Sequence, residues 1–240
     1  MAVIVDDKLI VLDIGGSIVA PHTPDTVYLR RLLSFLTQWL EEKSSRRVIL
    51  VVGGGGAARA WQKAARELTP LIQPDSLDWI GIMATRLNAE LLKVLLGSLC
   101  PDEVVCNPGA AHSFAGRVLL AAGWKPGFST DYDAVLLAER YEVGCLIMLS
   151  NIAQVYDADP RTHPQAKPIE KLTWREYHAL SGEKWSPGAN VPFDPVAAKK
   201  AALIGLTVVA ADGHDLDNLQ AILRGGEFVG TVITPDPPKG

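Results

Sequence analysis

The sequence predicts an α/β fold in which helices cover both faces of one mainly parallel sheet. Short apolar runs alternate with longer amphipathic stretches along the 240 residues, as expected for repeated strand–helix units. The run VILVV at 48–52 is apolar at every position, which is typical of a strand buried on both faces. Right-handed crossovers place the carboxyl ends of parallel strands along one edge, where ligands bind in open sheets.

Each strand is predicted where a short apolar run meets a turn residue. The first two runs, LIVLDIGG at 9–16 and RVILVVGGGG at 47–56, both end in glycine. Later runs are rich in valine, isoleucine and leucine and are bounded by turn-forming residues. We expect the remaining strands at 103–108, 117–123, 145–151, 206–213 and 229–234.

Each helix is predicted where apolar residues recur at a spacing of three or four. Gly97 is expected to end the helix at 80–97, since glycine is favoured just past a helix. Thr130 or Asp131 is expected to cap the following helix, and Asp194 a later one. The predicted helices cover 25–43, 57–69, 80–97, 130–143, 173–181, 194–205 and 218–226.

The composition is that of an ordinary globular protein and excludes several classes. The chain is 48% hydrophobic and 21% charged with a net charge of −4, so no basic surface for nucleic acid is expected. No apolar run reaches the roughly 20 residues that span a bilayer, and the first residues lack a signal-peptide pattern. We expect a cytoplasmic protein whose 3 cysteines are free thiols.

One segment differs from the rest of the chain. Residues 156–193 are polar and rich in proline, including YDADPRTHPQAKP and WSPGANVPFDP. We predict surface loops on either side of the helix at 173–181, within a single domain that covers 1–240.

Two glycine turns carry the functional signal. Gly15-Gly16-Ser17 and Gly53-Gly54-Gly55-Gly56 each follow a strand and precede a helix. Consecutive glycines let several N–H groups approach one anion, and a helix N-terminus adds the positive end of its dipole. Two such turns at one sheet edge would hold two phosphate groups facing each other, an arrangement suited to phosphoryl transfer. Neither turn has the P-loop pattern or the Rossmann spacing.

With these turns included, the chain resembles the amino-acid kinase superfamily, and within it the archaeal type of UMP kinase. The resemblance runs from about residue 9 to residue 234 and implies a three-layer αβα sandwich. It also implies an acceptor-binding lobe over about 1–140 and an ATP-binding lobe over about 141–240. The segments that carry the resemblance are VLDIGGSIV, VVGGGGAAR, DWIGIMATRLNA, KPGFSTDYDAVLLAE, SNIAQVYDADP, FDPVAAK and GEFVGTVIT.

The resemblance assigns roles to residues of both halves of the chain, with Mg²⁺ carried in by ATP and no metal cage built by the protein. It implies Arg59, Gly16, Ser17 and Asp131 as catalytic residues. For ATP binding it implies Gly16, Ser17, Gly55, Arg59, Ser150, Asn151, Tyr156 and Asp159. For the acceptor it implies Gly54, Asp78, Trp124, Lys125, Pro126, Gly127, Phe128, Ser129 and Thr130.

Several of these residues also have plain structural interpretations. Arg59 would be a solvated charge if its helix face pointed to solvent. Asp78 would cap the helix at 80–97, and Thr130 and Asp131 would cap theirs, without excluding a ligand role. Tyr156 would pack against the sheet.

The chain also departs from the pattern of the UMP kinases it resembles. Trp124 stands where a small hydroxyl residue is usual, and Phe128 where a histidine is usual. Gly56 replaces a lysine or another larger residue, and Ala153-Gln154 replaces Asp-Gly. Trp124 and Phe128 would either stack on a planar acceptor or fill the acceptor pocket.

The expected reaction is UMP + ATP to UDP + ADP. One alternative is a kinase of the same fold for another small phosphate or carboxylate acceptor. The other is a nucleotide-binding protein that stores molybdate or tungstate without catalysis. The resemblance also implies a homo-oligomer, a hexamer assembled from dimers, and the apolar helix at 80–97 is the candidate subunit contact.

Overall fold

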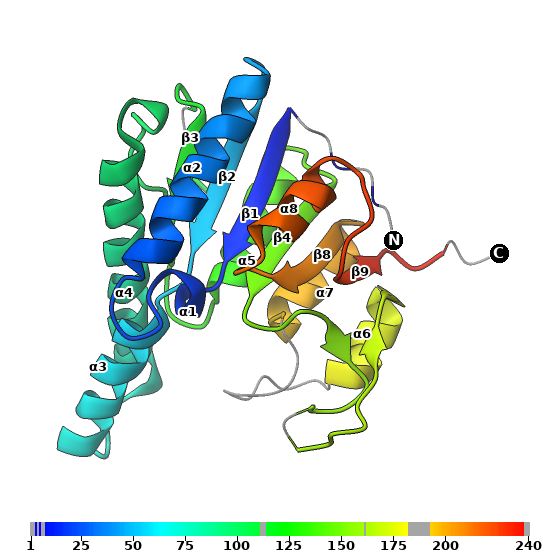
Figure 1. The fold of residues 1–240 in the computed structure, drawn as a ribbon. Helices are drawn as coiled ribbons and strands as arrows, with labels where there is room; N and C mark the ends of the chain where they lie inside the picture. The colour runs from blue at the N-terminus through cyan, green and yellow to red at the C-terminus, as the bar shows by residue number, and fades with distance from the viewer. Residues whose placement is uncertain are drawn as a thin grey trace.

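The sheet at the centre of the molecule confirms the predicted fold class. The computed structural model describes residues 3, 5, 8–110, 114–160, 162–181 and 193–237. Within this part, the sheet has the order β3-β2-β1-β4-β8-β9-β7 (Figure 1). Its strands are β1 (Leu9–Ile14), β2 (Arg47–Val52), β3 (Val118–Ala121), β4 (Cys145–Ser150), β7 (Lys171–Thr173), β8 (Thr207–Asp212) and β9 (Thr231–Thr234).

Strand direction places the glycine turns together. The β3, β2, β1, β4 and β8 strands are parallel neighbours, and β9 runs antiparallel to β8. Leu12 of β1 pairs with Leu50 of β2 and Ile147 of β4, so β1 lies between the strands that carry the other turns. The carboxyl ends of these parallel strands therefore share one edge.

Helices cover both faces of the sheet, as predicted (Figure 1). One face carries α2, α4 and α8, and the other carries α5, α6 and α7. The α3 helix packs on α4 and projects beyond the sheet. The helices are α1 (Gly16–Val19), α2 (Thr26–Glu42), α3 (Gly55–Leu68), α4 (Pro74–Leu96), α5 (Thr130–Arg140), α6 (Trp174–Ser181), α7 (Pro195–Leu203) and α8 (Leu216–Leu223).

Alternation along β1 divides the core into two layers. Ile10 and Leu12 pack with α2, α4 and α8, whereas Val11 packs with α5 and α7. Successive side chains of a strand point to opposite faces, so Asp13 shares the face of Val11. Asp13 is only 2% exposed, which makes it a carboxyl group inside an otherwise apolar layer.

One predicted strand is wrong. Residues 103–108 form no strand, and Val105 makes only an isolated bridge to Ala121. The Asn107 side chain accepts the N–H of Gly109 in a turn, and Pro108 has no N–H to donate to a ladder. Local turn formation therefore ends the pairing after one residue.

The start of α4 and the cap of α5 differ from their predictions. The helix expected at 80–97 begins at Pro74, because proline suits the first turn of a helix. Asp78 therefore lies inside α4, and its prediction as a cap is wrong. The cap of α5 is Ser129, whose Oγ accepts the N–H of Tyr132, and neither Thr130 nor Asp131 has this role. Gly97 and Asp194 cap their helices as predicted.

Some short elements carry no sequence signal. The four-residue α1 follows the first glycine turn, and β5 (Val155–Tyr156) pairs with β6 (Pro168–Ile169) outside the main sheet. The predicted loop over WSPGANVPFDP lies outside the described residues except at its end, 193–195. No helix in the described part of the chain is long and apolar enough to cross a membrane. The three cysteines are free thiols, as predicted.

Candidate functional site

The two glycine turns pack directly against each other at the carboxyl edge of the sheet. A Cβ at Gly16 would lie 2.1 Å from the backbone nitrogen of Gly55, and one at Gly53 would lie 2.4 Å from that of Gly16. Gly55 also has a φ of +63°, a left-handed conformation that L side chains rarely adopt. The backbones of the two turns meet because the residues in contact, Gly16, Gly53 and Gly55, carry no side chains.

This contact leaves N–H groups available for an anion. Four of them have no acceptor within the described residues, namely those of Gly16, Ser17, Gly54 and Gly55. They come from both turns, and Gly55 begins the α3 helix. Clustered N–H groups with a helix N-terminus attract negative charge, so this is the part of the molecule best suited to phosphate.

Arg59 connects the second turn to the first. Its Nη1 donates to the Ser17 Oγ at 3.0 Å, and its Nη2 donates to the Pro21 carbonyl at 3.1 Å. The guanidinium therefore lies beside the first turn, although it belongs to the helix that follows the second. A fixed cation at this position would offset charge on bound phosphates.

The geometry around Gly56 explains why this position carries no lysine or other large residue, unlike the kinases that the chain resembles. A Cβ at Gly56 would lie 2.2 Å from the carbonyl oxygen of Pro21, so this backbone leaves no room for a side chain. The Gly56 N–H donates to the Ala20 carbonyl at 2.8 Å, which fixes the close approach. In the described structure, Arg59 is the cation that contacts the first turn.

The α4 helix holds the predicted acceptor loop in place. The Thr85 Oγ1 accepts the N–H of Gly123 at 2.8 Å, and the Asp78 Oδ2 accepts that of Gly127 at 2.8 Å. Arg86 donates to the carbonyl oxygens of Gly123, at 3.2 Å, and Trp124, at 3.1 Å. Asp78 was predicted to face the acceptor, and here one of its oxygens binds the acceptor loop itself.

Another α4 side chain reaches the glycine turn, and the sequence interpretation missed it. The Asn88 Nδ2 donates to the Gly53 carbonyl at 2.8 Å, and Asn88 is buried. Thr85 and Arg86 were missed as well. The available signal was the spacing of Thr85 and Asn88, two polar residues three apart on an otherwise apolar helix face.

The aromatic residues of the acceptor loop stack on one another. The ring centroids of Trp124 and Phe128 are 5.5 Å apart, and those of Phe128 and Tyr132 are 4.6 Å apart. The Lys125 Nζ lies 3.9 Å from the centre of the Trp124 ring. We call Trp124, Phe128 and Tyr132 the aromatic stack. Phe128 is its middle ring, so the loop packs on itself through the residues that depart from the family pattern.

Four aspartates, Asp13, Asp131, Asp133 and Asp194, converge beneath this loop, and two of them bind it directly. The Asp133 Oδ2 accepts the N–H of Trp124 at 3.1 Å, and the Asp194 Oδ2 accepts the Ser129 hydroxyl at 2.6 Å. The Asp131 Oδ2 accepts the backbone N–H of Asp194 at 2.8 Å, which links α5 to α7. Asp131 was predicted as catalytic, and the structure places it within this group.

Burial raises the pKa values of these carboxyl groups. Loss of water raises the pKa of Asp131 to about 6 and that of Asp133 to about 7, and nearby negative charge adds to both effects. Burial first, and the charge of Asp131 second, raise the pKa of Asp13 well above its usual range. The site therefore holds protons on carboxyl groups near neutral pH.

The predicted ATP residues of the second half lie along the chain after β4. The Gly15 N–H donates to the Leu149 carbonyl at 2.8 Å, which brings Ser150 beside the first turn. In the described part, neither Asn151 nor Tyr156 makes a hydrogen bond to a glycine turn. Asp159 follows further along the chain, where its carbonyl accepts the N–H of His163.

The Ala153-Gln154 departure has a structural role. The Gln154 Nε2 donates to the Gly230 carbonyl at 3.0 Å, and the Val155 N–H donates to the Thr231 Oγ1 at 2.8 Å. These bonds fix the segment after β4 against β9. Among the described residues, no group of three His, Cys, Asp or Glu side chains is arranged to hold a metal ion.

Comparison with known proteins agrees with this geometry. A family model described as the amino acid kinase family matches residues 8–209. The chain is 35% identical to a uridylate kinase of Thermococcus onnurineus over 94% of this chain and 99% of that protein. It is 36% identical to a uridylate kinase of Methanospirillum hungatei over 94% of each.

Solved structures agree as well. A uridylate kinase from Archaeoglobus fulgidus superposes with a TM-score of 0.78 at 31% identity, covering 94% of this chain and 99% of that one. An aspartate kinase from Synechocystis superposes with a TM-score of 0.68 at 16% identity, covering 97% of this chain and 40% of that one. The second likeness concerns the fold alone.

Proposed function

Because the chain belongs to the amino acid kinase family, we propose that it transfers the γ-phosphoryl group of ATP to UMP, forming UDP and ADP. The observation that carries the proposal is the contact between the two glycine turns, with free N–H groups on both sides and Arg59 across them. The turns lie close enough to hold a donor and an acceptor phosphate together. The uridylate kinases at 35% and 36% identity support UMP as the acceptor.

The donor phosphates would lie on the first turn. The N–H groups of Gly16 and Ser17 would bind ATP phosphate oxygens, and Gly55 would bind from the second turn. Ser150, Asn151, Tyr156 and Asp159 would border the nucleoside, so the nucleoside of ATP would lie on the second half of the chain. That half, about 141–240, would form the donor lobe.

The acceptor would lie on the first half, about 1–140. Gly54 would bind the UMP phosphate, and the second oxygen of Asp78 would accept a ribose hydroxyl. The seven residues of the acceptor loop, from Trp124 to Thr130, would enclose the remainder of the nucleotide. An oxygen of the UMP phosphate would then bond to the γ-phosphorus as its bond to the β–γ bridging oxygen breaks.

Residues of both turns would stabilise the transferred group. The Arg59 guanidinium would offset the charge that develops on the γ-phosphoryl oxygens, and the free N–H groups would fix their positions. Asp131 would take part in catalysis from its place in the cluster of four aspartates beneath the acceptor loop. Mg²⁺ would arrive with ATP and neutralise phosphate charge, held by phosphate oxygens.

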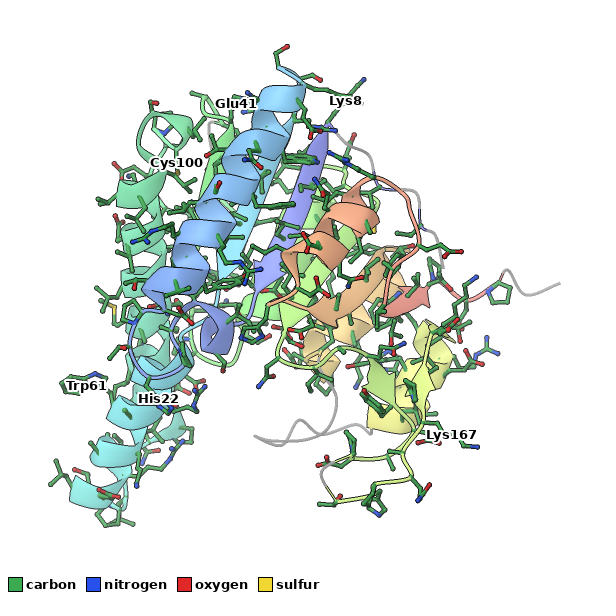
Figure 2. All side chains as sticks on the ribbon, in the orientation of Figure 1. Lys8, His22, Glu41, Trp61, Cys100 and Lys167 are labelled. Carbon is green, nitrogen blue, oxygen red and sulfur yellow. The ribbon has the colours of Figure 1, made fainter. Side chains whose placement is uncertain are left out.

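We also propose that the chain assembles as a homo-oligomer. A groove of about 650 Å³ between α3 and α4 is lined almost entirely by apolar side chains, including Trp61, Met83 and Leu87. Leu87 is 67% exposed and Trp61 69% exposed, and Figure 2 shows Trp61 pointing away from the rest of the molecule. Exposed apolar surface of this kind marks a subunit contact.

The test of the function is ADP release from Mg²⁺-ATP with UMP and, separately, other nucleoside monophosphates. We expect UMP to be preferred, and Arg59→Ala to lower kcat/KM by about a hundredfold or more because a fixed cation is lost. Arg66→Ala is the matched control, because Arg66 is exposed on the same helix, and it should stay within about twofold. Turnover with another acceptor alone would replace UMP, and turnover unaffected by Arg59→Ala would contradict the proposed site.

A further inference from the structure

Asp13 is a carboxyl group that the proposed reaction leaves without a role. It is the penultimate residue of β1, two residues before Gly15 of the first glycine turn, and it is 2% exposed. Its Oδ2 has no hydrogen-bond partner within the described residues. An unpaired buried carboxylate is costly, so the group must be neutral or held by a neighbour.

The neighbour is Asp131, whose carboxyl group lies within hydrogen-bonding reach of that of Asp13 and raises its pKa. Two carboxyl groups can share a hydrogen bond only when one of them carries a proton. Asp131 accepts the backbone N–H of Asp194 at 2.8 Å, which favours its charged form. No N–H of the described residues donates to Asp13, so the proton belongs on Asp13.

We propose that Asp13 is a positioning residue: it stays protonated and donates a hydrogen bond that fixes the Asp131 carboxylate beneath the acceptor loop. This inference rests on the proposed function, in which Asp131 takes part in catalysis. The bond ties β1, which carries the donor turn, to α5, which carries the end of the acceptor loop. The bond would therefore fix the position of the proposed donor site relative to the proposed acceptor site.

The surroundings of the pair support the neutral form. Asp133 of α5 and Asp194 of α7 bring further negative charge, and burial keeps water away. The Tyr177 hydroxyl of α6 is neutral and hydrogen-bonds to the backbone of Phe193, and the charge of Arg86 on α4 lowers the pKa of Asp133. With negative charge on two sides, ionisation of Asp13 would place two carboxylates in contact.

A pH dependence follows from this arrangement. Burial, and after it the charge of Asp131, raise the pKa of Asp13 well above its usual range, so the proton stays on at pH values where an exposed aspartate is ionised and is lost as pH rises through the raised pKa. Ionisation would break the bond and push Asp131 away from its position. We expect kcat to fall as pH rises through this raised pKa.

The experiment compares Asp13→Asn with Asp13→Val. Asparagine is neutral at every pH and still donates through Nδ2, whereas valine fits the apolar strand but donates nothing. We expect Asp13→Asn to retain kcat within about threefold and to lose the alkaline fall, and Asp13→Val to lower kcat by about tenfold or more. Equal losses in both variants, with the wild-type pH profile kept, would make Asp13 merely structural and overturn the inference.

A second readout does not depend on turnover. On the acid side of the kcat fall, the infrared C=O stretch of a protonated carboxyl group should be present in the wild type and reduced in Asp13→Asn. If this band shows no difference, the proton is not on Asp13 and the inference fails. If the band differs while UMP is not phosphorylated, the proposed function fails and the protonation of Asp13 stands.

Discussion

Asp133 shows how a single buried carboxyl group ties stability to pH. It is fully buried, its Oδ2 accepts the Trp124 N–H, and its Oδ1 has no partner within the described residues. Burial raises its pKa to about 7, whereas the ordinary value is 3.8. A carboxyl group with a raised pKa favours the folded state below its ordinary pKa, and this contribution is lost as pH rises through 7.

Asp133→Asn should therefore stabilise the protein increasingly as pH rises. Asparagine keeps an oxygen for the Trp124 N–H but has no proton to lose. Between pH 5 and pH 8 the variant should gain roughly 3 kcal/mol on the wild type, because the linkage of about 1.4 kcal/mol per pH unit acts over the two units up to pH 7. Thermal unfolding at several pH values measures this. Exposed Asp217→Asn is the control, and parallel curves for Asp133→Asn and wild type would contradict the prediction.

At the scale of residues, the sequence predicted the glycine turns correctly, but it did not predict the roles of the buried polar residues. The two turns were predictable because consecutive glycines after a strand have few other uses. The roles of Asp13 and Asn88 depend on which strand and helix lie beside them, and that information is in the tertiary structure. The Arg59 contact with Ser17 spans 42 residues, so spacing alone could not reveal it.

Among the elements, the acceptor loop has the clearest energetic test. Phe128 packs against both Trp124 and Tyr132, and each aromatic pair contributes about 0.5–1.5 kcal/mol beyond burial. Phe128→Ala should release the loop and raise KM for the acceptor by about tenfold, since roughly 1.4 kcal/mol is a factor of ten. KM for ATP should change little, because in the proposed arrangement the loop contacts the acceptor and not ATP. Steady-state kinetics with each substrate varied in turn measures both values.

Phe114→Ala is the matched control for this prediction. The Phe114 ring packs on that of Tyr141 at 5.8 Å, a pair of similar kind outside the acceptor loop. The Phe114→Ala variant should leave KM for ATP and KM for the acceptor unchanged. A parallel rise in KM for ATP and acceptor in Phe128→Ala would mean that the aromatic stack supports the whole site.

Elements were predicted well where periodicity was long and poorly where it was short. The helix α2 is within one residue of its prediction at each end, because its apolar face extends over several turns. The start of α4 was placed too late, since Pro74 to Trp79 carry a weaker apolar pattern. Strand 103–108 failed because a β-branched pair is not sufficient when an asparagine turn and a proline follow it.

For the whole molecule, the strand–helix alternation was enough to predict a mainly parallel sheet with helices on both faces. The strand predicted at 229–234 contains β9, but its antiparallel direction was not predictable. The separate β5–β6 pair was not predictable either, because strands of two residues carry little pattern. The same limit applies to surfaces. The apolar stretch at 80–97 indicated a buried or a subunit-contact helix, and only the structure shows which of its side chains remain outside.

Those exposed side chains lead to the last prediction. Met83 is 57% exposed and Leu87 67% exposed on α4, beside the α3 groove. A stable interface buries about 800 Å² on each partner, and a charge placed in its apolar centre opposes association. Leu87→Asp should therefore reduce the oligomer seen by light scattering to smaller species, whereas Leu203→Asp, 81% exposed on α7, should not. A monomeric wild type, or an oligomer indifferent to Leu87→Asp, would show that this face is not the subunit contact.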